Sequence, residues 1–148
     1  MLDQSFNTLD DLDVNGQLVL VRADLNLPVT EDLKIADDTR LKRLVPTLTE
    51  LSARGARTIV ISHFGRPKGQ RVRNLSLEIA TLPLSSALHG LRVAFAHDCV
   101  GQPARSVVST IKSGEIALLE NLRFYDGEES NDPNFATQLA ELGTQYIN

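Results

Sequence analysis

The run Leu18-Val19-Leu20-Val21 is the first of several short apolar segments whose spacing along the chain decides the fold. A run of four residues is too short for a typical helix, so it predicts a buried strand. Further short segments rich in leucine, isoleucine or valine predict strands at residues 58–61, 92–96, 116–119 and 145–147. The chain therefore contains five candidate strands, distributed along its whole length.

Segments with helical spacing lie between the predicted strands. Apolar residues at the i, i+3, i+4 and i+7 positions predict an amphipathic helix between Leu41 and Leu51. The polar residues 37–39 precede this helix, Gly55 follows it, and Pro46 predicts a kink. Further helices are predicted for residues 76–90, 103–111 and 133–142.

Strands and helices alternate throughout, which predicts an α/β fold: a three-layer, doubly wound parallel sheet of the Rossmann-like type. No helix follows the last predicted strand, residues 145–147, although parallel sheets normally bury both faces. We therefore expect this fifth strand to lie at an edge of the sheet, or to mark the truncation of a longer fold.

The composition is that of an ordinary globular protein. Hydrophobic residues make up 42% and charged residues 23% of the 148, which excludes a disordered or collagenous chain. The formal charge of −4 argues against indiscriminate binding to nucleic acid, and no apolar stretch approaches the roughly 20 residues of a membrane span. Cys99 is the single cysteine, so no internal disulfide can form, and we expect it to be a small buried residue of a cytoplasmic protein.

Polar side chains follow three of the predicted strands. Asp24 and Asn26 come after the first strand, His63 and Arg66 after the second, and Arg123 after the fourth. Ligands of open α/β sheets bind outside the carboxyl ends of the strands, so these residues are candidates for a site. Guanidinium groups engage phosphate or carboxylate through two parallel hydrogen bonds, and aspartate and asparagine bind hydroxyl groups. The pattern favours a small ligand that is phosphorylated, hydroxylated and acidic.

Charge is distributed unevenly along the chain. Residues 34–73 contain ten lysines or arginines but only three acidic residues, within a protein that is acidic overall. This segment is a candidate anion site. The sequence contains neither G-x-x-x-x-G-K-[ST] nor G-x-G-x-x-G, so it has neither of the common phosphate loops for a nucleotide.

Each candidate residue also has a simpler interpretation. Asp24 and Asn26 could shape a turn, and His63 could be a hydrogen-bonded core residue. Four charged residues could belong to solvent-exposed loops: Arg71, Arg73, Glu128 and Glu129. The occurrence of polar residues after three strands together is what favours an anion site.

Five motifs also occur in a fixed order along the chain. They are Arg22-Ala23-Asp24-Leu25-Asn26-Leu27-Pro28, Asp37-Asp38-Thr39-Arg40, Ser62-His63-Phe64-Gly65-Arg66-Pro67, Asp98-Cys99-Val100-Gly101 and Leu118-Leu119-Glu120-Asn121-Leu122-Arg123-Phe124. In sequence, order and approximate spacing they resemble the signatures of the phosphoglycerate kinase family. The resemblance extends over essentially all 148 residues.

The resemblance implies a glycolytic enzyme that transfers a phosphoryl group reversibly between 1,3-bisphosphoglycerate and ADP, giving 3-phosphoglycerate and ATP. The substrate site that it implies consists of Asp24, Asn26, Arg40, His63, Phe64, Gly65, Arg66 and Arg123. In this site Arg40 is the implied catalytic residue, directed at the transferred phosphoryl group.

The resemblance also implies roles for the other site residues. Asp24 and Asn26 would bind the hydroxyl and carboxylate end of the glycerate. Its phosphate would be held by His63, Arg66 and Arg123. These implied roles agree with the ligand chemistry that the strand-end residues favour on their own.

Complete members of that family are much longer and carry a separate C-terminal nucleotide domain. Residues 1–148 are therefore expected to be an incomplete N-terminal phosphoglycerate-binding domain, with the Mg-ATP or Mg-ADP site outside this chain. We expect the complete protein to be a monomer that binds neither nucleic acid nor membrane, and the chain alone to be inactive.

Two other functions stay open. The chain could be a non-catalytic anion-binding module that lacks a partner domain. It could also bind nucleic acid through its basic segment, but an aromatic content of 5% and an acidic isoelectric point argue against base stacking.

Overall fold

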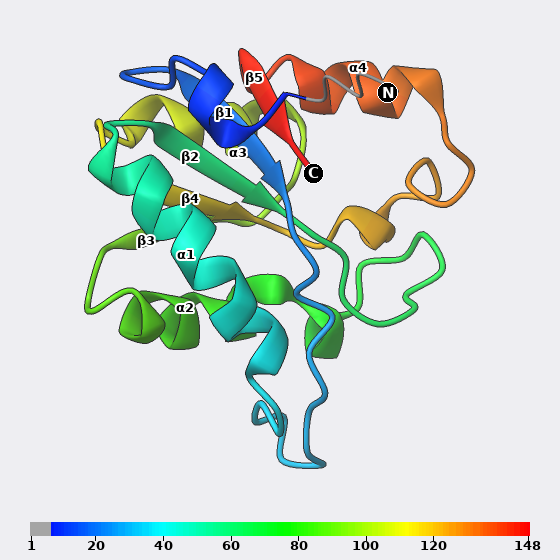
Figure 1. The fold of residues 1–148 in the computed structure, drawn as a ribbon. Coiled ribbons are helices and arrows are strands. Elements are labelled where there is room, and N and C mark those ends of the chain that lie inside the picture. The colour runs from blue at the N-terminus through cyan, green and yellow to red at the C-terminus, as the bar shows by residue number, and fades with distance from the viewer. Residues whose placement is uncertain (1–6) are drawn as a thin grey trace, which may run out of the picture.

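The computed structural model describes residues 7–148, which form alternating strands and helices (Figure 1). The strands of this part of the chain are β1 (Leu18–Arg22), β2 (Arg57–Ile61), β3 (Val93–Ala96), β4 (Ile116–Leu119) and β5 (Gln145–Ile147). Its α-helices are α1 (Thr39–Ala53), α2 (Thr81–Ala87), α3 (Gly101–Thr110) and α4 (Pro133–Ala140). Each predicted strand is present, with its ends shifted by one residue at most.

Every strand pair is parallel, and the strand order is β3-β4-β2-β1-β5. Arg22, the last residue of β1, lies beside Ile61, the last residue of β2. Val60 of β2 lies beside Leu118 of β4. The carboxyl ends of these three strands therefore lie side by side at one end of the sheet. β5 is an edge strand, in agreement with one of the two alternatives for residues 145–147.

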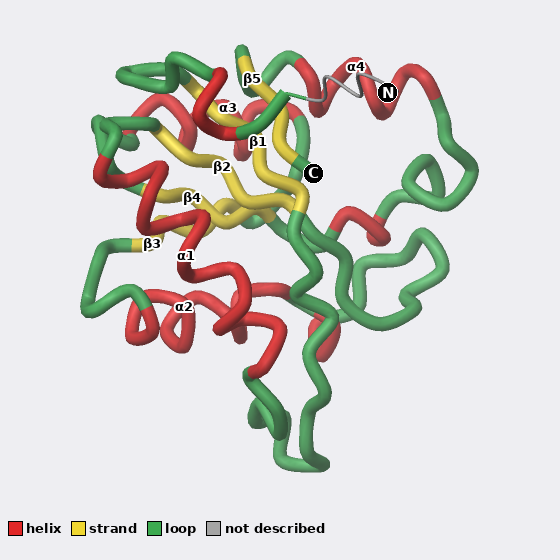
Figure 2. The backbone as a smooth tube through the Cα atoms, in the orientation of Figure 1, coloured by secondary structure: helices red, strands yellow, loops and turns green. Residues whose placement is uncertain are grey.

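Helices cover both faces of the sheet (Figures 1 and 2). α1 and α2 pack on one face, where Leu48 and Leu84 join Leu118 in a buried cluster. α3 and α4 pack on the other face, where Phe135 and Leu119 belong to a second cluster. Leu118 and Leu119 are neighbours in β4 and point to opposite faces, as strand geometry requires. The predicted three-layer, doubly wound fold is confirmed.

Residues 76–90 do not form one continuous helix. Leu77–Ala80 form a short 3₁₀ helix, and α2 then begins at Thr81 and ends at Ala87. Pro83 lies in the first turn of α2, where its missing N–H costs no internal hydrogen bond. The proline thus favours a new helix start inside the segment instead of continuing the earlier one.

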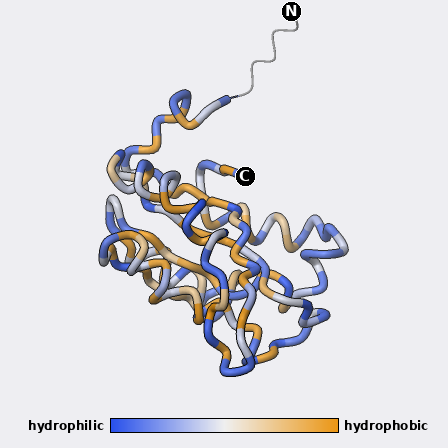
Figure 3. Tube along the Cα trace, turned by 60° about the horizontal axis from the view of Figure 1, so that its bottom comes forward, coloured by the Kyte–Doolittle hydropathy of each residue, from blue (hydrophilic) through white to orange (hydrophobic). Residues whose placement is uncertain are grey.

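Hydrophobic and hydrophilic stretches alternate along the chain (Figure 3). This alternation is what amphipathic helices and half-buried segments produce when they pack around a sheet. Within residues 7–148 no helix combines the length and the hydropathy that crossing a membrane requires.

The interior position of β4, between β3 and β2, predicts a large effect of truncating one of its side chains. Leu118 has no exposed surface, so we expect Leu118→Ala to lower the free energy of unfolding by about 2–5 kcal/mol. Urea denaturation measures this change. The matched control is Leu82→Ala, because Leu82 is 80% exposed and its truncation is expected to change stability by about 0.5 kcal/mol at most. Equal effects of the two substitutions would contradict the assigned core.

Candidate functional site

A buried serine joins the loops that follow β1, β2 and β4. Ser62, the residue after β2, is 1% exposed. Its hydroxyl oxygen accepts a hydrogen bond of 2.9 Å from the backbone N–H of Leu25, and its carbonyl oxygen accepts one of 3.0 Å from Leu122. Because a buried polar group is costly unless it is hydrogen-bonded, these contacts fix the three loops relative to one another.

Asn121, which follows β4, makes a second set of buried connections. Its Oδ1 accepts hydrogen bonds from the backbone N–H groups of Phe64, at 3.1 Å, and Arg123, at 3.0 Å. Its Nδ2 donates to the carbonyl oxygens of Phe64, at 2.6 Å, and Leu75, at 2.9 Å. The ring of Phe64 is buried in the core and Asn121 binds both of its backbone polar groups, so this residue of the predicted site shapes the loop and presents no exposed side chain.

Asp24, Asn26 and Arg40 lie together. The Arg40 guanidinium is 3.4 Å from each carboxylate oxygen of Asp24 and also donates to the Asn26 carbonyl oxygen. The Asn26 Oδ1 accepts a hydrogen bond of 2.9 Å from the backbone N–H of Gly65. Gly65 has a φ of 62°, and a Cβ there would lie 2.6 Å from a methyl carbon of Leu75. The turn therefore favours glycine, chiefly because of this left-handed backbone conformation.

Arg123 belongs to a second cluster, which includes two residues that sequence reasoning did not assign to the site. Glu128 Oε1 lies 2.8 Å from Arg22 Nη2, and Glu128 Oε2 lies 2.8 Å from Arg123 Nε. The side chain of Glu128 is 7% exposed, so its interpretation as an exposed loop residue is wrong. Folding brings Glu128 into contact with Arg22, which lies 106 positions earlier in the chain. No local sequence pattern reveals such a contact.

Charged side chains of both clusters, the one with Asp24 and the one with Arg123 and Glu128, shift the pKa of His63. Burial lowers the pKa of this half-buried histidine below its ordinary value, and the positive charge of Arg123 adds to the effect. The carboxylates of Glu128 and Asp24 act in the opposite direction. We call this surface the strand-end rim, formed by Arg22, Asp24, Asn26, Arg40, His63, Gly65, Arg66, Arg123 and Glu128.

The basic segment 34–73 does not form one site. Arg54 donates to two backbone carbonyl groups that precede β1, and Arg57 donates to the Gly16 carbonyl at 3.1 Å, near the amino ends of the strands. Arg66 is exposed, and within residues 7–148 no hydrogen bond or ion pair engages its side chain. The segment is thus divided between the two ends of the sheet, because β2 runs from one end to the other.

Arg71 is not a freely solvated loop residue. Its Nη1 donates to the His97 carbonyl at 2.8 Å, and its Nη2 lies 3.3 Å from an Asp98 carboxylate oxygen. The guanidinium also lies 5.3 Å from the centre of the Phe124 ring. The side chain keeps about half of its surface exposed but is tied to the loop after β3, which corrects the simpler interpretation.

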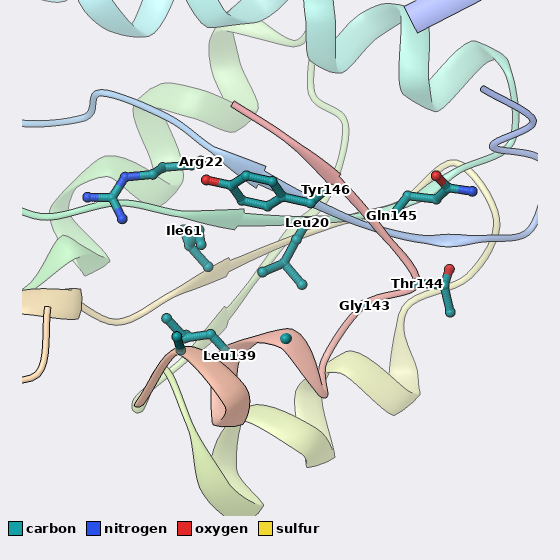
Figure 4. Close-up of a pocket in the computed structure, with 10 residues that line it drawn as sticks. Leu20, Arg22, Ile61, Leu139, Gly143, Thr144, Gln145 and Tyr146 are labelled. Atoms are coloured by element: carbon teal, nitrogen blue, oxygen red, sulfur yellow. The ribbon is translucent and has the colours of Figure 1, made fainter. Parts of the chain in front are cut away.

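A separate cavity of about 450 Å³ lies between α4 and the adjoining strands β1 and β5 (Figure 4). Leu20, Ile61 and Leu139 give it apolar walls, and Arg22 is the one charged residue that lines it. No other member of the strand-end rim contributes to its walls. Its chemistry therefore differs from that of an anion site.

The single cysteine is buried and does not have the surroundings of a reactive nucleophile. Cys99 is 1% exposed, and burial raises the pKa of its thiol to about 12, with the Asp98 carboxylate adding to the effect. The expectation of a small buried cysteine is confirmed. Among residues 7–148 no three histidine, cysteine, aspartate or glutamate side chains are grouped to hold a metal ion.

The fold and the rim together define a doubly wound α/β protein with basic and polar side chains at the carboxyl ends of its strands. The family model of phosphoglycerate kinase matches residues 9–148. The chain therefore belongs to the phosphoglycerate kinase family.

Relatives and solved structures agree with this assignment. The phosphoglycerate kinase of Rhodospirillum centenum is 54% identical over 144 residues, and that of Caulobacter sp. is 50% identical over 143 residues. Each alignment covers 97% of this chain and 36% of the relative. The crystal structure of phosphoglycerate kinase from Pyrococcus horikoshii matches with a TM-score of 0.82 and 31% identity, over 95% of this chain and 35% of that one. The chain thus spans about a third of the length of these relatives.

The surroundings of His63 predict its titration. Because its pKa is lower in the folded chain than in the unfolded one, His63 contributes stability above pH 6.5 that is lost as the pH falls through the folded-state pKa. An NMR titration of the His63 ring should give a midpoint below the ordinary 6.5. The substitution Arg123→Gln should move this midpoint upward, because it removes a nearby positive charge. A wild-type midpoint at or above 6.5 would contradict this geometry.

Proposed function

We propose that this chain is the phosphoglycerate-binding domain of a phosphoglycerate kinase and that its strand-end rim binds 3-phosphoglycerate. In a protein as long as the relatives, the reaction would be reversible phosphoryl transfer between 1,3-bisphosphoglycerate and ADP. The observation that carries this proposal is the grouping of Asp24, Asn26 and Arg40 with His63 and Arg123 at one end of the sheet.

The hydrogen bonds of the rim support specific roles for its polar residues. The Oδ1 of Asn26 accepts a hydrogen bond from the N–H of Gly65. The Nδ2 of Asn26 can therefore donate to a carboxylate or hydroxyl oxygen of the glycerate. The Asp24 carboxylate can accept a hydrogen bond from the same hydroxyl group. The ligand phosphate would be held by Arg66, which is free of other partners in residues 7–148, with Arg123 and His63 beside it.

Arg40 would act on the phosphoryl group that is transferred. Phosphoryl transfer depends mainly on positioning and on neutralising the charge of the transition state, so the protein need not supply a nucleophile. Arg40 is held by Asp24 and by the Asn26 carbonyl, which fixes its planar guanidinium at the rim. A lysine could not reproduce this arrangement, because its ammonium group is a flexible point charge.

The nucleotide would bind elsewhere in a longer protein. This chain contains neither of the common phosphate loops for a nucleotide, and the basic side chains of the rim are the ones assigned above to the phosphoglycerate. We assign the nucleotide to the remaining length that the relatives have. The chain alone would then bind 3-phosphoglycerate without catalysing transfer, and the complete protein would act as a cytoplasmic monomer.

Calorimetry with 3-phosphoglycerate tests this function on the 148-residue chain. We expect saturable binding that is specific for the ligand's stereochemistry, and weaker binding of inorganic sulfate. Arg66→Ala should weaken 3-phosphoglycerate binding by about 1.5–3 kcal/mol, the range for hydrogen bonds to charged groups.

The matched control is Arg92→Ala. It makes the same change in charge, but Arg92 directly precedes β3 and so lies at the amino end of the sheet. We expect its affinity for 3-phosphoglycerate to equal that of the wild type. Equal affinities for sulfate and 3-phosphoglycerate would instead favour a generic anion-binding module, and equal losses in both variants would remove Arg66 from the site.

A further inference from the structure

Glu128 makes the most strongly buried ion pairs of the strand-end rim. Its side chain is 7% exposed, and its two carboxylate oxygens each lie 2.8 Å from a different guanidinium group. Arg22 comes from the end of β1, and Arg123 from the 3₁₀ helix Leu122–Phe124 that follows β4. One carboxylate therefore connects two strand ends.

The atoms used in these contacts leave both arginines able to bind a further anion. Arg123 uses its Nε, so both of its terminal amino groups remain available. Arg22 uses one terminal nitrogen, Nη2, so its Nη1 remains available. Because a guanidinium group carries five N–H donors, Glu128 orients these two groups without exhausting them.

The guanidinium groups of Arg22 and Arg123 are stabilised by the negative charge of the Glu128 carboxylate between them. Two guanidinium groups repel each other when they converge, and the repulsion is strong where solvent is partly excluded. Although burial raises the pKa of Glu128, the hydrogen bonds from Arg123 and Arg22 lower it more, so its pKa lies below its ordinary value. Glu128 is therefore ionised at neutral pH and compensates one of the two positive charges.

The loop that carries Glu128 is held firmly in place. Its neighbour Gly127 packs against α4, where a Cβ would lie 2.8 Å from the Cβ of Phe135. The Gly127 carbonyl also accepts a hydrogen bond of 3.0 Å from Asp132, and the ring of Tyr125 stacks on that of Phe135 at 5.3 Å. The carboxylate is thus presented from a packed segment, as a positioning group requires.

We propose that Glu128 is a positioning residue that fixes the guanidinium groups of Arg22 and Arg123 at the place where the rim would receive the phosphate. This inference rests on the proposed binding of 3-phosphoglycerate at the rim. The phosphate would be received by the terminal nitrogens that Glu128 leaves free. Arg66 would approach the same phosphate from the loop after β2.

The sign of one affinity change tests the proposal. Removing a carboxylate from an anion site strengthens anion binding if the carboxylate merely repels the ligand or occupies its place. If Glu128 positions the arginines, Glu128→Gln weakens 3-phosphoglycerate binding, by about tenfold or more. Calorimetry on the 148-residue chain measures both the sign and the size of the change.

The adjacent residue provides a matched control. Glu129 is 53% exposed, and its carboxylate lies 3.8 Å from the same Arg123 Nε, so Glu129→Gln makes the same change in net charge without removing a short hydrogen bond. We expect this variant to keep the wild-type affinity within about twofold, because exposed ion pairs contribute little.

A spectroscopic signature separates positioning from a general loss of structure. In the wild type, ¹⁵N relaxation should find the Arg123 Nε–H group rigid, and in Glu128→Gln it should become mobile while backbone spectra keep the native pattern. Should Glu128→Gln fail to fold, Glu128→Asp retains the charge but shortens the side chain, and it should also weaken binding.

The outcomes distinguish this inference from the proposed function. If the wild-type chain binds no 3-phosphoglycerate, the proposed function fails and the positioning role fails with it. If the wild type binds and Arg66→Ala weakens the complex, but folded Glu128→Gln or Glu128→Asp binds equally well or more tightly, only the positioning role of Glu128 is overturned.

Discussion

The buried hydrogen bonds of Ser62 and Asn121 are the interactions on which the strand-end rim depends. Parallel pairing brings the ends of β1, β2 and β4 to one edge, but the loops beyond those ends have no sheet ladder to fix them. Ser62 links Leu25 to Leu122, and Asn121 satisfies both backbone polar groups of Phe64. Loss of either side chain would leave backbone groups buried without a partner, which costs more than the hydrogen bond itself contributes.

On this scaffold, carboxylates of the same chain hold three of the basic side chains of the rim. Asp24 pairs with Arg40, and Glu128 pairs with Arg22 and Arg123. Each pairing reduces repulsion between like charges and restricts long, flexible side chains before any ligand arrives. A site arranged in this way loses less conformational entropy on binding than one made of free arginines. Arg66 differs from them, since no partner within residues 7–148 engages it.

Much of the fold follows from local pattern, because short buried strands and amphipathic helices carry their periodicity in the sequence. Leu18–Val21 and Ile116–Leu119 identify strands, and their polar continuations identify the edge where the rim lies. Residues 76–90 were predicted less well, because a proline tolerated in the first turn of a helix can mark either a kink or a new start. Glu128 could not be found from sequence pattern, since its contact with Arg22 spans 106 positions and exists only after folding.

The proposed function requires one ligand to contact side chains from three separate strand ends. A crystal structure of the chain with 3-phosphoglycerate tests this most directly. It should place the phosphate within hydrogen-bond distance of Arg66 and Arg123, and the carboxylate or hydroxyl group beside Asn26 and Asp24. A ligand bound instead in the apolar cavity beside α4, or near Arg57 at the amino ends of the strands, would overturn the proposed function.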